Sequence, residues 1–565
     1  MFKSILFVGC ILFGGWSFAE TVAKPQELKI GLAQDFDTLQ PAISSMLSST
    51  YIYNMVARKL ISLDENMQWQ PQMAEKIPSL ENGGAQIIKE NGVEKIRATW
   101  TLKKGVQWGD GVPVTCADFQ FSQEVGSSKQ VAVVNRDSYD QVERVECEAG
   151  QPSLVRFVHT SVRWDFFKMV QYYILPAHLE KKIFTEMTAA KDQKEAYDKN
   201  SLYVKDPTNP GLFNGPYLIS EFKIGSHVVL TRNPKFYGEP AKIAKIIIKI
   251  IPNSSTMESQ LLAKDIDLIA NIGFNLDQAL IIDKKVKEVK LPYTVIYEPA
   301  LLYEHIDFNL DHPLLKDPQV RKALRLAVDR QLMVQSLFEG KQSVSAHFLS
   351  PRDPWFASVG ISKDPFLPNR RASEKMWDEL GWKKNEKDGY RYKEGQKLSF
   401  VLSTTAGNKL RETVETFLLD QWKKVGVEVV IKNLPPRVFF GDLMKNRKFE
   451  GMAMYAWSFL PEAVPTQFYH SEQVPSEKNS FAGRNYMGWK NAEVDRSMNQ
   501  LEIERDPKKR VQLIRQIVKN YVNEMPTLPL YHRADVSVIP RALKGYHPTG
   551  HQQLETNFVE NWRFE

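Results

Sequence analysis

The sequence predicts an α/β protein with more than one domain. Its 565 residues exceed what one hydrophobic core holds, so two or three domains are expected. The composition, 43% hydrophobic and 25% charged, is that of an ordinary globular protein. Residues 398–402 and 427–434 form strands on either side of a helix over 408–425, and such a unit is a crossover between parallel strands.

Periodicity and caps predict further elements. Residues 96–103 alternate as a half-buried strand, and a short strand is expected over 106–108. Thr115 and Asp118 form a near capping box, which predicts that a helix begins at about Cys116. One helix with a single apolar stripe is predicted over 317–340. Other predicted elements are strands over 27–33 and 245–251 and helices over 51–60 and 507–525.

The N-terminus has the layout of a secretory signal. Lys3 supplies a positive charge, and residues 5–13 are apolar but shorter than the ~20 residues that a membrane span needs. Ser17-Phe18-Ala19 suits signal peptidase. We expect a signal peptide over 1–19 and a periplasmic protein; acylation of Cys10 as a lipoprotein is the alternative.

The charge and the cysteines narrow the class further. The formal net charge of +7 is spread over mixed signs without a long basic run, so no nucleic-acid partner is expected. Only Cys116 and Cys147 remain after the predicted cleavage, which favours one disulfide in an exported chain. A buried pair of free thiols is the alternative.

No catalytic or metal motif is found. The chain lacks G-x-S-x-G, H-E-x-x-H and a phosphate-binding glycine loop. His547 and His551 are four apart, but Pro548 and Gly550 between them disfavour a helical metal pair. We therefore expect no enzyme, no cofactor and no metal site.

Residues 100–119 carry a resemblance to a known family. Their order, W-T-L-K-K-G-V-x-W-x-D-G-x-P-V-T-x-x-D-F, resembles the signature of extracellular solute-binding proteins of peptide/nickel type, family 5, the receptors of ABC importers. Residues 214–237 and 317–330 also match family segments. Cys116 and Gln40 depart from the family, which usually has a small residue and an Asp there.

The resemblance implies a two-lobed periplasmic binding protein of class II, type 2 topology, with an additional small inserted domain. One lobe would be discontinuous, because the insert interrupts it and the chain returns to it at the C-terminus. The implied parts are lobe I (20–63, 209–299 and 537–565), the insert (64–208) and lobe II (300–536).

The resemblance also implies a ligand site between the lobes. Trp457 matches the Trp of the family's "W-x-x-D", with Tyr455 as a second aromatic candidate, although both residues also suit a core. Leu460 stands where the family Asp pairs with a peptide's α-ammonium. Either Glu462 replaces that Asp, or the ligand has no free N-terminus there. Candidates that match the family by spacing are Ser45, Leu47 and Asn271.

The expected function is that of a monomeric periplasmic substrate-binding component of an ABC importer. It would capture a peptide or peptide-like solute by hinge closure and deliver it to a permease complex in the inner membrane. The alternatives are a receptor for an oligosaccharide, an opine-like compound or a metal chelate, and a sensor or chaperone-like binding protein without transport.

Overall fold

The structure, a computed structural model, describes residues 27–189, 195–361, 365–479, 481 and 483–565. The predicted signal peptide and Cys10 lie outside these residues. The central element is a mixed sheet of ten strands in the order β17-β16-β18-β12-β19-β11-β1-β10-β9-β8. Their bounds are β1 (Glu27–Leu32), β8 (Tyr217–Lys223), β9 (His227–Arg232), β10 (Lys245–Ile250), β11 (Leu268–Ile269), β12 (Tyr293–Phe308), β16 (Ser399–Ser403), β17 (Glu428–Ile431), β18 (Met452–Ser458) and β19 (Thr527–Pro540).

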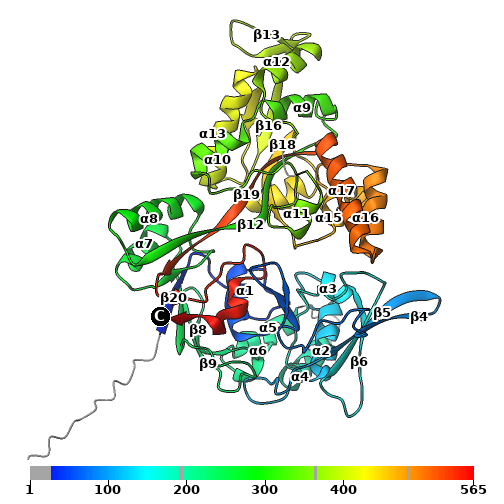
Figure 1. Ribbon diagram of the computed structural model, residues 1–565, viewed down its shortest axis with the longest axis vertical. Coiled ribbons are helices and arrows are strands. Elements are labelled where there is room, and N and C mark those ends of the chain that lie inside the picture. The colour runs from blue at the N-terminus through cyan, green and yellow to red at the C-terminus, as the bar shows by residue number, and fades with distance from the viewer. Residues whose placement is uncertain (1–26, 190–194, 362–364, 480, 482) are drawn as a thin grey trace, which may run out of the picture.

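Two long antiparallel strands, β12 and β19, connect the upper and lower halves of the molecule in Figure 1. The predicted limits of lobe II, residues 300 and 536, fall inside these strands, so both strands belong to both lobes. Their ladder is irregular between Pro299 and Tyr303. Proline has no N–H to donate, and such residues are confined to edges and irregularities of a sheet.

The upper half contains the predicted parallel crossover. Strands β16 and β17 pair in parallel on either side of α13 (Lys409–Lys424), as expected from residues 398–434. The single helix predicted over 317–340 is wrong. It is two helices, α9 (Pro318–Leu326) and α10 (Arg330–Phe338), because the Asp329 side chain accepts a hydrogen bond from the N–H of Leu332 and begins a new helix.

The remaining helices pack on both halves of the sheet (Figure 1). The lower half carries helices α1 (Leu47–Val56), α4 (Ala177–Thr188), α7 (Ser254–Leu262) and α8 (Leu276–Glu288). The upper half carries α12 (Arg370–Glu379), α16 (Ala492–Ile503) and α17 (Pro507–Glu524). No helix in the described part of the chain is long and apolar enough to cross a membrane.

The insert contains a separate antiparallel sheet in the order β4-β5-β7-β6. Its strands are β4 (Ala85–Glu90), β5 (Val93–Thr101), β6 (Val142–Cys147) and β7 (Leu154–His159). The helix α2 (Cys116–Ser127) begins with the predicted capping box between Thr115 and Asp118. The short strand expected over 106–108 is only an isolated bridge between Gln107 and Pro113.

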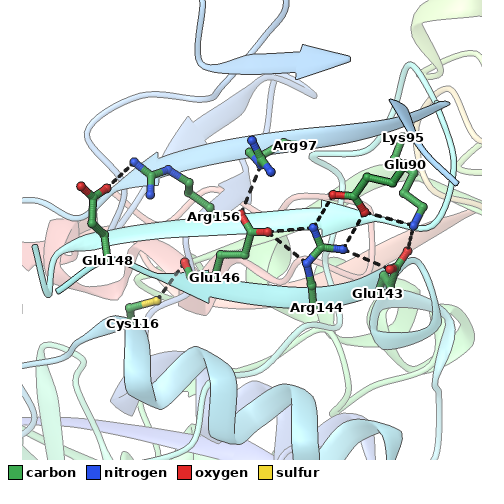
Figure 2. A network of polar contacts seen from close by, with 9 residues as sticks. All are labelled: Glu90, Lys95, Arg97, Cys116, Glu143, Arg144, Glu146, Glu148 and Arg156. Atoms are coloured by element: carbon green, nitrogen blue, oxygen red, sulfur yellow. Dashed lines mark hydrogen bonds and ion pairs between the residues drawn. The ribbon is translucent and has the colours of Figure 1, made fainter. Parts of the chain in front are cut away.

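One face of this sheet carries charges of alternating sign (Figure 2). Arg144 contacts Glu90 at 2.7 Å and Glu146 at 2.8 Å, so it links the edge strands β4 and β6. A disulfide between Cys116 and Cys147 ties the start of α2 to the end of β6. The first helix and the last edge strand of the insert are therefore covalently joined.

The predicted domain limits do not coincide with the limits of the hydrophobic cores. Phe121 and Phe184 of the insert pack in one cluster with Leu28 of β1 and Tyr51 of α1. The insert's sheet has a cluster of its own around Trp100. The insert's helices thus share their core with lobe I, and the boundaries at 64 and 208 remain predictions.

Candidate functional site

A cavity of about 510 Å³ lies where the ladder between β12 and β19 is irregular. The N–H of Ala534, opposite Pro299, donates instead to the Gln342 side chain at 2.7 Å. The N–H of Leu301 donates to the carbonyl of Gly550 at 2.8 Å. The cavity walls come from both lobes and the insert, with residues in the segments 44–50, 171–173, 271–276, 300–302, 533–536 and 550–554 together with Val134, Gln342, Leu410 and Ser458.

The loop before α1 brings two predicted residues to this cavity. Asp37 accepts hydrogen bonds from the hydroxyls of Ser44 at 2.6 Å and Ser49 at 2.7 Å, which holds the loop against the helix. Ser45 and Leu47 consequently line the cavity. Leu47 is 40% exposed, so its apolar side chain is accessible to a molecule in the cavity.

Asn271, the third predicted residue at this cavity, follows the short strand β11 and lies beside Asp535 of β19. Burial raises the pKa of Asp535 to about 6, although a hydrogen bond from Asn271 and the positive charge of Arg533 oppose the rise. The Oδ1 atom of Asn271 is buried and has no hydrogen-bond partner among the described residues. The pair thus presents acceptor atoms to the cavity.

A buried charge cluster stands under the cavity at Arg533. The Nε of Arg533 donates to Glu304 at 2.8 Å, and the Nε of Arg411 donates to the other oxygen of Glu304 at 2.7 Å. Burial alone would raise the pKa of Glu304, but the charges of Arg533 and Arg411 outweigh it and lower that pKa to about 2. Because α13 carries Arg411 and the long strands carry the other two, the cluster fixes this wall of the cavity.

A second buried cation supports the opposite wall. The Nζ of Lys59 donates to the carbonyl of Val170 at 3.0 Å and to the side chain of Gln553 at 3.3 Å, and it lies 4.8 Å from the ring centre of Tyr173. Burial lowers the pKa of Lys59 to about 7. Gln553 and Tyr173 both line the cavity, so Lys59 holds the C-terminal segment against the insert.

The two predicted aromatic residues lie outside this lining. Tyr455 is completely buried, and its hydroxyl donates to Asp307. Trp457 packs against Tyr455 and Phe468, with ring centres 5.4 Å and 4.9 Å away. The structure places Tyr455 in the core. Trp457 is partly exposed, and only its neighbour Ser458 reaches the cavity, so a ligand role for Trp457 remains a prediction.

A smaller cavity of about 360 Å³ is lined by neighbours of Trp457. Its lining includes Tyr486 and Arg484, and both contact the Trp457 ring, with distances of 5.9 Å between ring centres and 5.5 Å from the guanidinium carbon. Trp457 thus has its neighbour Ser458 at the larger cavity and its ring partners at the smaller one. This geometry supports the hypothesis for Trp457 without making it a residue of the larger cavity.

Glu462, the remaining candidate, also lies outside the lining of the larger cavity. Its Oε2 lies 3.4 Å from the Nζ of Lys168 in the insert, and its N–H donates to Asp353 at 3.1 Å. Its φ of 52° is in the left-handed region. The carboxylate is therefore engaged by an internal cation rather than free to replace the Asp missing at Leu460.

Sequence reasoning missed the two charged residues of the cavity that lie on β19, Arg533 and Asp535. A signal was present, because these two charges stand two residues apart in a stretch, 527–540, that is rich in apolar residues. Residues i and i+2 of a strand face the same side, which places both on the cavity face. The residue types within 550–554 carry no such signal and were found only from the structure.

The chain matches the profile of a protein family described as bacterial extracellular solute-binding proteins, family 5 (middle), over residues 68–476. It belongs to this family. The resemblance of residues 100–119 is thereby confirmed, and this family 5 protein is a solute-binding protein. The fold is that of two-lobed class II binding proteins, as expected.

Two relatives are similar to this family 5 protein over most of its length. The oligopeptide-binding protein AppA of Bacillus subtilis is 27% identical over 552 residues, which are 97% of this chain and 93% of AppA. The oligopeptide-binding protein OppA of the same organism is 24% identical and covers 92% of this chain and 89% of its own. The similarity is therefore spread over the whole chain and is not confined to one motif.

Solved structures agree with this assignment. The structure of AppA from Bacillus subtilis in complex with a nonapeptide superposes with a TM-score of 0.72 at 26% identity, covering 96% of this chain and 100% of that one. The oligopeptide-binding protein of Thermus thermophilus in complex with a pentapeptide gives a TM-score of 0.72 at 23% identity, with 94% and 95% covered. The latter likeness supports the fold alone.

Proposed function

We propose that the protein captures a peptide or peptide-like solute in the cavity between its lobes and delivers it to an ABC permease. The observation that carries this proposal is a cavity of about 510 Å³ with walls from lobe I, the insert and lobe II, crossed by β12 and β19. Its size is within the range of small-molecule sites. The names of AppA and OppA, and the nonapeptide bound to AppA, support a peptide ligand.

Capture would be non-covalent, and the two long strands would act as the hinge. A ligand that contacts both lobes favours the arrangement in which the lobes are close, because it binds that state better. We propose that the mature protein is a periplasmic monomer without enzymatic activity. Fractionation of cells tests the periplasmic location, and light scattering of the purified protein tests the oligomeric state.

The ligand itself is tested by native mass spectrometry of protein purified without refolding. A peptide carried through purification, and its replacement by synthetic peptides, are the expected results. Detection of a chelate or a sugar, with no binding of a random peptide pool, would overturn the peptide proposal and favour the second candidate, a receptor for a non-peptide solute. Leu460 in place of the family Asp is the observation that keeps this candidate open.

A further inference from the structure

Four ionisable side chains line the larger cavity in the described part of the chain: Tyr173, Arg533, Asp535 and His551. Burial raises the pKa of Tyr173 to about 12, so this phenol is neutral near pH 7. The ring of His551 is engaged at both nitrogens, by the carbonyl of Asp64 at 2.9 Å and the N–H of Gln553 at 3.1 Å. Burial lowers the pKa of His551 to about 4, so this ring is neutral near pH 7. The charges that face a ligand are therefore those of Arg533 and Asp535.

These two charges differ in how they are compensated. Arg533 is bound to the carboxylate of Glu304. Asp535 forms no ion pair within 4.0 Å with any described residue, and its hydrogen-bonding neighbour is the neutral side chain of Asn271. A half-buried carboxylate that lacks a bound cation loses part of its hydration without compensation, and this cost falls when a cation binds.

A second buried acid stands behind Asp535. The Glu555 carboxylate accepts a hydrogen bond from Tyr546 at 3.0 Å, and the negative charge of Asp535 contributes to the raised pKa of Glu555. On the paired strand β12, Glu298 is opposite Asp535 in the register and is bound to Arg352. Arg352 is thus engaged by Glu298, and Glu555 is itself an acid, so neither neighbour supplies a cation to Asp535.

We propose that Asp535, together with the Oδ1 atom of Asn271, binds a primary ammonium group of the solute. This inference rests on the proposed function and deepens it by naming the recognised group. An ammonium has three N–H donors. The site offers the unpartnered Oδ1 of Asn271 and the carboxylate of Asp535, which accepts a hydrogen bond from Asn271 but forms no ion pair among the described residues. The N-terminus of a peptide and a lysine side chain share this chemistry.

The loop after β18 has no free carboxylate to bind an ammonium, which is consistent with a site at Asp535 instead. Leu460 has no carboxylate, and Glu462 is held by Lys168. Asp535 lies on a strand shared by both lobes, so a bound ammonium would be fixed at the hinge rather than on a loop. Rigid elements position charged groups more accurately than loops do.

The pH dependence of binding follows from the groups around Asp535. Asp535 must be ionised to bind an ammonium, and its carboxyl takes up a proton near pH 6. Arg533 on the same strand and the hydrogen bond from Asn271 favour ionisation, whereas burial opposes it. Glu298 on the paired strand is bound to Arg352, and Glu555 has a pKa raised to about 7, so it holds its own proton over most of this range. Affinity for an ammonium ligand should fall about tenfold between about pH 7.5 and pH 5, because about one tenth of the carboxyl is ionised at the lower pH.

The experiment uses three pools of random synthetic tetrapeptides and the full mature protein. The first pool has free N-termini and no lysine, the second is N-acetylated without lysine, and the third is N-acetylated with one lysine. Binding of each pool is measured by native mass spectrometry and calorimetry at about pH 7.5, with the wild type, Asp535→Asn and Glu462→Gln. Circular dichroism and the unfolding temperature show that both variants are folded.

The expected result is that the wild type prefers the first or the third pool to the second by about tenfold or more, as for a charge-paired buried group. Asp535→Asn should lose this preference and the pH dependence, and Glu462→Gln should keep the preference. A preference for the first pool identifies the N-terminus, and one for the third pool identifies lysine. Equal binding of all pools, or a preference that survives Asp535→Asn, would overturn the inference and leave the peptide function standing. No binding of any pool would overturn the proposed function as well.

Discussion

Lys168 of the insert and Glu462 of lobe II form an ion pair across the two parts, with the lysine Nζ 3.4 Å from Oε2. The same Nζ donates to the carbonyl of Pro461 at 3.3 Å and lies 4.4 Å from the ring centre of Trp164. The Lys168 side chain is 8% exposed, so the contact is more protected than a surface pair. It links the loop after β18 to a segment far away in the sequence.

This contact predicts that Lys168→Met weakens ligand binding without a direct contact to the ligand. Loss of a protected charge-assisted hydrogen bond costs about 1.5–3 kcal/mol, part of which methionine recovers by packing on Trp164. We expect a loss of affinity of about threefold to tenfold in calorimetry and a larger radius of gyration in small-angle scattering. Lys182→Met, at an exposed helix position of the insert, is the matched control. Unchanged scattering and affinity in Lys168→Met would contradict a role in holding the parts together.

The contacts of Trp457 with Tyr486 and Arg484, which line the smaller cavity, predict a specific optical effect of ligand binding. Because the chain holds 12 tryptophans, the ligand-induced fluorescence change must be compared between wild type and Trp457→Phe. We expect most of that change to disappear in the variant and Trp457→Ala to lower affinity about tenfold, as for loss of an aromatic contact. Trp489→Phe, a buried site in lobe II, should keep the change. A full response in Trp457→Phe with wild-type affinity in Trp457→Ala would remove Trp457 from the site.

The disulfide between Cys116 and Cys147 predicts a loss of stability on its removal. The bond closes a loop of 31 residues, and the loss of loop entropy in the unfolded chain is worth about 3–4 kcal/mol. We expect the variant with both cysteines replaced by serine to unfold at a lower urea concentration than the oxidised wild type. The reduced wild type should unfold at about the same urea concentration as the variant. Thiol titration of the denatured, unreduced mature protein should find no free thiol, and two free thiols would refute the bond.

The buried carboxyl of Glu555 predicts a pH-dependent stability. Its pKa rises from 4.5 to about 7, mainly because of burial, so the folded state retains a proton that the unfolded state has released. The stabilisation from this group is complete below about pH 4.5 and falls as pH rises towards about pH 7, by on the order of 3 kcal/mol. Glu555→Gln should therefore gain stability relative to the wild type as pH rises from about 5 to 8.

Urea unfolding of wild type and Glu555→Gln at several pH values measures this difference. Glu565→Gln is the matched control, because the side chain of Glu565 is 52% exposed. The control should follow the wild-type pH dependence. A constant difference between Glu555→Gln and the wild type at all pH values would show that Glu555 does not carry the effect.

Local patterns predicted the elements that are fixed by neighbouring residues. The capping box at Thr115 and Asp118 and the parallel crossover around α13 depend on contacts within a few residues or on one helix, and both are confirmed. The helix over 317–340 failed for the opposite reason. Its apolar stripe continues through the break, and only the hydrogen bond made by the Asp329 side chain divides it.

The predicted site residues also fall into those that the sequence placed correctly and those whose place depends on distant contacts. Ser45 and Asn271 lie on loops and Leu47 begins α1, at places that follow from the family's order of elements, and all three line the cavity. Tyr455 lies in the core because its hydroxyl meets Asp307 of β12, a partner 148 residues away that no local pattern indicates. Glu462 is engaged by Lys168 for the same kind of reason.

The irregular ladder between β12 and β19 has a mechanical consequence. A ribbon of two long strands resists stretching because its cross-strand hydrogen bonds act together, and it yields most easily where Pro299 leaves one bond unmade. Ala300 and Leu302 at this weak point also touch the cavity. If these strands are the hinge, as proposed above, a solute held there would contact the hinge directly and could favour closure without coupling through the rest of the molecule.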